Sequence, residues 1–339
     1  MTRTPPRRSL TLPVIRAAAI ATALLFLSAC ATQGSTVVAL SLMPGGAGSV
    51  ELNDTPFFPA KDHQNGPAAL ATMLGASGVT ATPAELASLI HLPRHDSLQA
   101  ELQELPPKYE RLSYQIAPEL AAILVELAAH RPVLVLQDSG ASLLSKWHFA
   151  VVIGYDVKHD TLVLRSGTKR RQVASAREFM TAWSNADFWA MLVLRPGELP
   201  SVVSRERYLA AAADFERGAR PEDAVLVFDA ALKRWPDEPS AWIGRAAARR
   251  ETGDLLAAAR DYTTALRIDG SDTEARNSLA LTLLDFGCIH KAQSQIDQIR
   301  EAALPDPVRT RIEGSRDRIT ARSQNLLAQE PASCAEFAH

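Results

Sequence analysis

The residues with the clearest chemical arrangement lie around Asn65, which is followed by Gly66 and Pro67. Glycine lets the backbone turn sharply, and proline fits the first helical turn, where its missing N–H costs nothing. The sequence therefore predicts that residue 65 lies at a helix N-terminus, where the dipole and unpaired N–H groups would stabilise a thiolate. His148 lies in an apolar run typical of a strand and would supply the base. This arrangement suits acyl transfer, but asparagine is no nucleophile.

Only cysteine could replace the missing group in thiol chemistry, so the positions of the three cysteines are decisive. None lies between residues 31 and 287. Cys30 ends an N-terminal targeting segment, Cys288 lies in a predicted helical repeat, and Cys334 lies in the tail. A disulfide between Cys288 and Cys334 and two unpaired thiols both agree with the spacing, so the sequence leaves this pairing open.

The first 30 residues have the pattern of a secretion signal. An arginine-rich start precedes the apolar run Ala17–Leu27, which is too short to span a bilayer on its own. The run leads into Leu-Ser-Ala-Cys, which resembles the bacterial lipoprotein box, with Cys30 as the lipidated residue. An aspartate directly after the lipidated cysteine would resemble an inner-membrane retention signal, but residue 31 is alanine. We therefore expect a lipid anchor in the outer membrane, facing the periplasm. The alternative is an ordinary signal peptide.

Length and composition indicate two domains after a tether. About 310 residues remain once the signal is removed, enough for two ordinary domains. The net charge is −2 and charges of both signs are mixed, without the basic stripe of a nucleic-acid-binding protein. Residues 31–50 lack a periodic pattern and suit a flexible tether.

Residues 51–197 have the mixed pattern of an α+β domain, with helices first and an antiparallel sheet afterward. The predicted helices are 67–77, 83–90 and 117–129, and the predicted strands are 132–137, 148–155, 161–165 and 188–194.

From residue 205 to 306 a spacing of about 34 residues recurs, which is the period of tetratricopeptide repeats. We expect three repeats, each a pair of helices, followed at 307–339 by a capping helix and tail. A generic helical bundle is the alternative. Such arrays bind peptides or proteins in a concave groove, for which Arg245, Arg249 and Asn277 are candidates. A solvated helix face explains the same three residues.

Two segments of the first domain carry a family resemblance. Residues 57–59 (Phe-Phe-Pro) and 64–70 (Gln-Asn-Gly-Pro-Ala-Ala-Leu) resemble the active-site segment of papain-like, bacteriocin-leader-processing (double-glycine) peptidases. Residues 147–156 (Trp-His-Phe-Ala-Val-Val-Ile-Gly-Tyr-Asp) resemble their histidine strand, about eighty residues later. With the repeats, the layout is similar to proteobacterial lipoproteins of cysteine-peptidase type. The resemblance implies a papain-like fold with a peptide cleft.

Three departures from that family weaken the catalytic interpretation. Asn65 occupies the position of the nucleophilic cysteine, and His148 that of the base. Ala60 replaces a glutamine that donates to the oxyanion, a loss that typically costs roughly 100- to 1,000-fold in rate. The neighbouring Gln64 is a candidate polar contact in the cleft. The family also places an aspartate near the end of the strand after the histidine strand, where it would orient the histidine ring. That aspartate is missing here, and Ser166 is a weak candidate for its role.

Simpler explanations exist for these residues. Asparagine is a strong helix N-cap, and a histidine in an apolar strand is often a core residue. The adjacent Asp62 and His63 lack the spacing of a metal site, so we expect neither metal nor cofactor. The favoured hypothesis is a degenerate peptidase that binds a peptide or protein without cutting it, while its repeats recruit a protein partner. An active peptidase of the same family and a purely structural adaptor are the alternatives.

Overall fold

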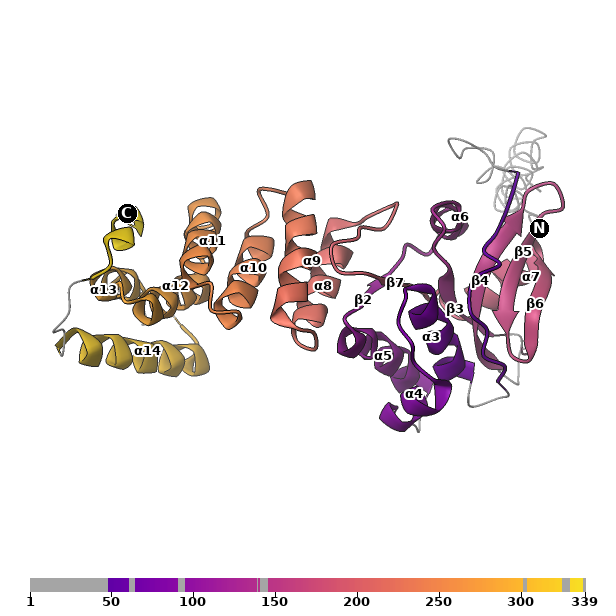
Figure 1. Ribbon diagram of the computed structural model, residues 1–339, viewed down its shortest axis with the longest axis horizontal. Coiled ribbons are helices and arrows are strands. Elements are labelled where there is room, and N and C mark those ends of the chain that lie inside the picture. Colours follow the sequence, from indigo (N-terminus) through magenta and orange to yellow (C-terminus); the bar gives the residue numbers. More distant parts are fainter. Residues whose placement is uncertain are drawn as a thin grey trace, which may run out of the picture.

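The computed structural model describes residues 48–60, 65–90, 95–138, 140, 146–300, 304–324 and 330–337. The predicted signal segment, most of the tether, Cys30 and Gln64 lie outside these residues. Figure 1 shows an elongated molecule with a sheet and its helices at one end and a row of helices extending from it. Within the described ranges, no helix is both long and apolar enough to cross a membrane.

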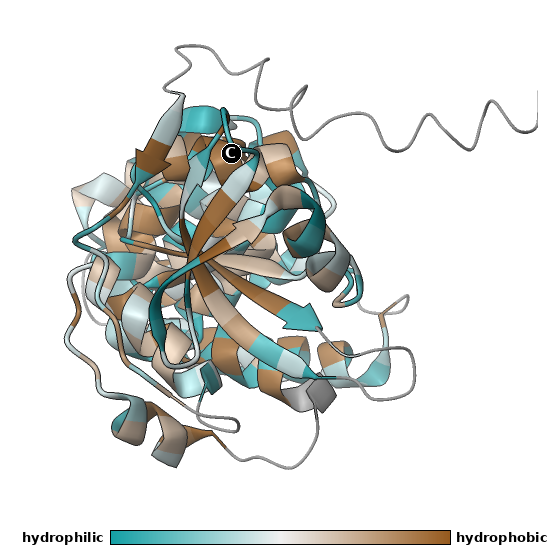
Figure 2. Ribbon diagram, turned by 90° about the vertical axis from the view of Figure 1, so that its right-hand side faces the viewer, coloured by the Kyte–Doolittle hydropathy of each residue, from teal (hydrophilic) through white to brown (hydrophobic). Residues whose placement is uncertain are grey.

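The first part contains one antiparallel sheet, whose strands follow the order β2-β7-β3-β4-β5-β6, with β1 paired to β4. Seen from the sheet end in Figure 2, hydrophobic colours follow the strands in the middle. The strands are β1 (Ser49–Glu51), β2 (Leu112–Gln115), β3 (Val133–Asp138), β4 (Trp147–Asp156), β5 (Thr161–Ser166), β6 (Lys169–Ser175) and β7 (Ala190–Leu194). Strand β1 begins at Ser49, two residues before the boundary predicted at residue 51.

Helices pack against both faces of this sheet. On β4, Phe149 and Val151 belong to one buried cluster, whereas Ala150 and Val152 belong to another. Alternate side chains of a strand point to opposite faces, so the two clusters are the two faces of the sheet. The first face carries α3 (Asn65–Ala76), α4 (Pro83–Leu89) and α5 (His95–Glu104), and the second carries α6 (Leu120–Ala128) and α7 (Ala176–Ser184).

Beyond the sheet, three helix pairs repeat at a constant spacing. Their first helices begin 34 residues apart, at Arg205, Pro239 and Thr273. The helices are α8 (Arg205–Glu216), α9 (Pro221–Arg234), α10 (Pro239–Glu251), α11 (Leu255–Ile268), α12 (Thr273–Phe286) and α13 (Ile289–Asp297), followed by α14 (Asp306–Gln324). The predicted fold class, an α+β domain followed by an all-α repeat region, is confirmed.

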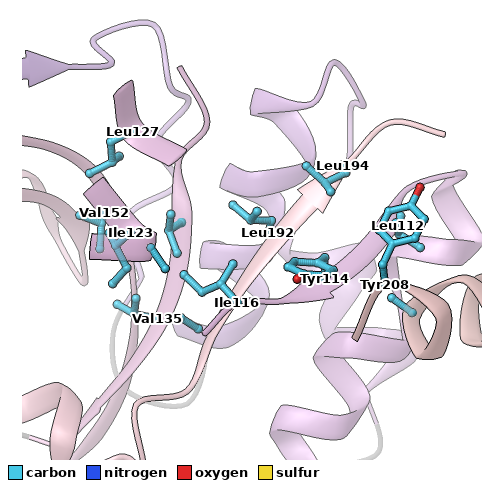
Figure 3. Packing of buried hydrophobic residues seen from close by; sticks show 14 of the residues in the cluster. Leu112, Tyr114, Ile116, Ile123, Leu127, Val135, Val152, Leu192, Leu194 and Tyr208 are labelled. Carbon is cyan, nitrogen blue, oxygen red and sulfur yellow. The ribbon is translucent and has the colours of Figure 1, made fainter. Parts of the chain in front are cut away.

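The two parts share one hydrophobic core. Tyr114 of β2 and Tyr208 of α8 lie with ring centroids 6.4 Å apart, and both are buried. Figure 3 shows Tyr208 beside the sheet residues Leu112 and Tyr114. The backbone N–H of Ser204 donates to the Tyr114 hydroxyl at 3.0 Å, which fixes the connecting segment as well. The repeats are therefore packed onto the sheet rather than attached by a loose linker.

The pairing that the sequence left open is a disulfide between Cys288 and Cys334. Cys288 precedes α13, and Cys334 lies in a short 3-10 helix (Ala332–Phe337) near the C-terminus. Both side chains belong to the buried cluster of the last repeat, together with Phe337 and Ile312. The bond therefore holds the C-terminal segment against the end of the repeat array and closes a long loop of chain, which favours the folded state.

Helices α9 and α10 pack so closely that a larger side chain at their contact should destabilise the protein. A Cβ at Gly244 in α10 would lie 2.2 Å from the ring of Phe228 in α9. We expect Gly244→Ala to lower the free energy of unfolding by about 1–3 kcal/mol, because the packed ring must move. Gly314→Ala is the matched control, since a Cβ there meets nothing within 4 Å, and alanine favours a helix. Equal urea midpoints for the two variants would contradict this packing.

Candidate functional site

Asn65 is the first residue of α3, as its position before Gly66 and Pro67 predicts. Its side-chain oxygen Oδ1 accepts a hydrogen bond from the backbone N–H of Phe149, with an N···O distance of 3.4 Å. This bond ties the start of α3 to strand β4, next to His148. No acidic residue occupies the first turn of α3, so the positive end of the helix dipole is not offset by a carboxylate of that turn.

His148 lies on β4 opposite Gln137 of β3 and is partly buried. Burial lowers its pKa, while a hydrogen bond to the backbone of Lys146 acts in the opposite direction. Because the pKa falls below the ordinary value of about 6.5, the imidazole is neutral at pH 7 and able to accept a proton. This is the protonation state that a general base requires.

The backbone next to His148 lies against Asn65. The helix α3 that carries Asn65 covers one face of β4, whereas the His148 side chain points to the other face. Trp147 and Phe149 pack on the α3 face, whereas Ala150 belongs to the opposite cluster. Because side chains alternate along a strand, the His148 side chain points to the same face of β4 as Ala150. The assignment of Asn65 and His148 to the nucleophile and base positions of one catalytic pair therefore stays a prediction.

Ser166, at the end of β5, is brought close to the start of α3. It is 8% exposed and lines a small pocket together with Asn65. Ala60 lies in the same pocket, and its N–H donates to the carbonyl of Gly167 at 3.1 Å. The segment that carries residue 60 therefore lies beside the start of α3, as expected for the oxyanion donor. Its side chain, however, is the methyl group of an alanine, which donates no hydrogen bond. The role of Ser166 in orienting His148 stays a prediction.

Arg165 is a pocket residue that the sequence interpretation missed. It is 6% exposed and lines the same pocket, and its Nη2 donates to the carbonyls of Asn53 and Thr55 at 3.1 and 3.2 Å. Its Nη1 donates to the carbonyl of Arg170. Burial lowers its pKa, but a guanidinium stays protonated at neutral pH. The signal available in the sequence was an arginine directly after the apolar run Leu162–Leu164 of a predicted strand.

The three groove candidates in the repeats are used inside the array. Arg245 donates to Asp229 and Asp261 at 2.6–2.8 Å and lies over the ring of Trp242. Arg249 donates to Asp261 at 2.7 Å. Asn277 is 4% exposed and is therefore not offered to solvent. The two arginines hold neighbouring helices together, and a role for any of the three in partner binding stays a prediction.

The described residues contain neither a thiol for catalysis nor a group of three potential metal ligands. Cys288 and Cys334 are joined to each other, far along the chain from α3. Histidine, cysteine and acidic side chains do not gather in threes within the ranges that the structure covers. The groups that the pocket does offer are a buried cation, a hydroxyl, an amide and a helix N-terminus.

No family model matches the chain. A stretch of 91 residues, 27% of this chain, is 28% identical to the peroxisomal targeting signal receptor of Saccharomyces cerevisiae, and the match spans only 15% of that receptor. A protein described as a C39-like peptidase of Bacillus anthracis aligns with a TM-score of 0.36 and 17% identity, over 43% of this chain and 98% of its own.

A second solved structure aligns with part of the chain. The type III secretion translocator chaperone SycD of Yersinia enterocolitica has a TM-score of 0.34 and 22% identity, over 36% of this chain and 90% of its own. The overall alignments are weak, so the architecture rests on the elements described above. An α+β domain precedes a region of helical repeats.

The position of residue 65 at a helix N-terminus predicts the behaviour of a thiol placed there. In a chain lacking Cys30, we expect the Asn65→Cys thiol to have a pKa below the ordinary value of about 8.5, because the dipole of α3 stabilises the thiolate. The pH dependence of alkylation by iodoacetamide measures this value. Ser88→Cys, exposed in the last turn of α4, is the control and should show no such decrease. Equal pKa values would rule out a thiolate-stabilising position.

Proposed function

We propose that this protein binds a peptide or protein through its peptidase-like domain without hydrolysing it. One observation carries the proposal. The residue at the start of α3, where a thiolate would have to lie, is Asn65, and its Oδ1 is engaged with the strand. A carboxamide is too poor a nucleophile to replace a thiolate in forming an acyl-enzyme. The described residues offer no other thiol, because their two cysteines are joined in a disulfide.

The residues around Asn65 agree with a pocket that has lost the groups for peptide hydrolysis but can still bind a ligand. Ala60 lines the pocket with a methyl group and adds no side-chain donor for a developing oxyanion. Phe57, Phe58 and Phe149 supply apolar walls, as in sites that bind organic ligands. The function best supported is therefore recognition of a ligand, in which the peptidase-like fold serves as a binding scaffold.

The repeat region supports a second, protein-binding role within the same molecule. Stacked helix pairs form an extended curved surface, which is the usual basis of protein recognition by such arrays. Because α8 shares a core with β2, a partner held by the repeats would be kept at a fixed distance from the pocket. The proposed division of work is ligand binding by the sheet domain and recruitment of a partner by the repeats.

The proposed location is the periplasm, with a lipid at Cys30 as the anchor to the outer membrane. The N-terminal segment has the pattern of a lipoprotein signal, which is the main support. The disulfide between Cys288 and Cys334 is an independent reason, since such bonds persist mainly in oxidising compartments.

The test of the proposed function is a count of new peptide termini. A soluble chain that starts after Cys30 is incubated with periplasmic proteins, and the termini are counted by mass spectrometry against a buffer control. We expect the wild-type chain to produce none above the control. New termini that appear with wild type and disappear with His148→Ala would show an active peptidase and refute the proposal. His148→Ala is the control that separates activity of this chain from a contaminating protease.

A further inference from the structure

The side chain of Arg165 lies on the face of β5 that α3 covers. Val163, two residues earlier, belongs to the buried cluster of α3, whereas Leu162 and Leu164 belong to the cluster on the opposite face. Alternation along the strand therefore directs Arg165 toward α3, and Arg165 does line the pocket at the start of that helix. The guanidinium lies under the segment 53–55, whose carbonyls it contacts.

The hydrogen bonds of Arg165 leave its charge without an anion among the described residues. Its partners are carbonyl oxygens, and the nearby Glu51 pairs instead with Arg171 at 2.8 Å. The Nε atom is buried and has no partner within the part of the chain that the structure describes. A buried cation is normally paired with an anion, and a buried N–H is normally bonded. Arg165 is therefore a buried cation whose charge is not neutralised by an ion pair among the described residues.

Other groups at the pocket also favour a bound anion. The N-terminus of α3, a helix of 12 residues, contributes a positive partial charge and has no acidic residue in its first turn. The Oδ1 of Asn65 faces the N–H of Phe149, so its Nδ2 donors point to the other side of the amide. Ser166 adds a hydroxyl. A thiolate at position 65 would repel a bound anion, whereas the neutral asparagine does not.

We propose that this pocket binds the C-terminal carboxylate of a peptide. This inference rests on the proposed function and names the group that the pocket recognises. The walls are apolar, with Phe57, Phe149 and Val151 among them, and the pocket is small. A carboxylate matches the planar donors of a guanidinium, and the adjoining peptide is itself partly apolar. The acceptor that Arg165 Nε lacks would be one of the carboxylate oxygens.

The test compares two peptides that differ only at the C-terminus. N-acetyl-tetraalanine with a free carboxylate and the same peptide as a C-terminal amide are titrated into the soluble full chain by calorimetry. We expect the amide to bind about 10- to 100-fold more weakly, the usual effect of losing charge-assisted hydrogen bonds. Equal affinity of the two peptides, or no binding of the acid, would overturn the inference.

An isosteric variant tests the pocket without removing the buried arginine. Asn65→Asp keeps an oxygen acceptor for the Phe149 N–H and suits a helix N-terminus, but it adds a negative charge to the pocket. We expect it to weaken binding of the acid at least about 10-fold. Gln115→Glu, exposed on β2, changes the net charge equally and should leave the affinity unchanged. Equal effects of the two variants would refute a local carboxylate site.

Two further arms separate the sources of failure. Sodium acetate is titrated alone, and an affinity as high as that of the peptide acid would show a site for small free carboxylates rather than for peptide ends. The mass of each peptide is measured after the titration. Cleavage of the peptide would refute the proposed function, whereas intact peptides that bind with equal affinity would refute only the inference about the carboxylate.

Discussion

Burial of strand β4 on both of its faces is the constraint on which the rest of the structure depends. Phe149 and Val151 hold α3 on one face, and this contact places Asn65 beside the start of the central strand β4. Ala150 and Val152 belong to the cluster on the opposite face, which continues through Tyr114 to Tyr208 of the first repeat helix. The same strand thus supports the pocket and, through the core behind it, the attachment of the repeats.

The chemistry of the pocket follows from two positive groups that the fold places there, the N-terminus of α3 and the guanidinium of Arg165. A thiol site would use the positive end of α3 to stabilise its thiolate. Here residue 65 is a neutral asparagine, so the helix end and the buried guanidinium of Arg165 face the pocket without an intervening negative charge from residue 65. An environment suited to stabilising a thiolate is equally suited to holding the anionic group of a ligand.

The sequence predicted those elements whose burial produces a clear pattern. Strands β3, β4, β5 and β7 are apolar runs because helices cover both faces, and α3 follows the Gly-Pro signal. The 34-residue period identified the repeats. Strand β6 was missed because it is a polar, mostly exposed edge strand, and β2 because it has only four residues. Helix α7 was missed although Ser175 and Glu178 form a capping box at its start.

The site was predictable only in part. The position of Asn65 at the helix start came from local residues, whereas its bond to Phe149 joins residues 84 apart in the chain and depends on how α3 docks. Arg165 was overlooked because a single arginine in a strand is usually exposed, and its burial depends on the segment 53–55 folding over it. The disulfide likewise required the three-dimensional position of the tail.

The most direct test of binding without hydrolysis is an NMR titration of the soluble chain with N-acetyl-tetraalanine carrying a free carboxylate. We expect the side-chain Nε–H signal of Arg165 and the backbone amide signal of Phe149 to shift in proportion to occupancy, while the peptide signals stay those of the intact peptide. Saturable binding that leaves both protein signals unmoved, or the steady appearance of signals from a cleaved peptide, would contradict binding without hydrolysis at this pocket.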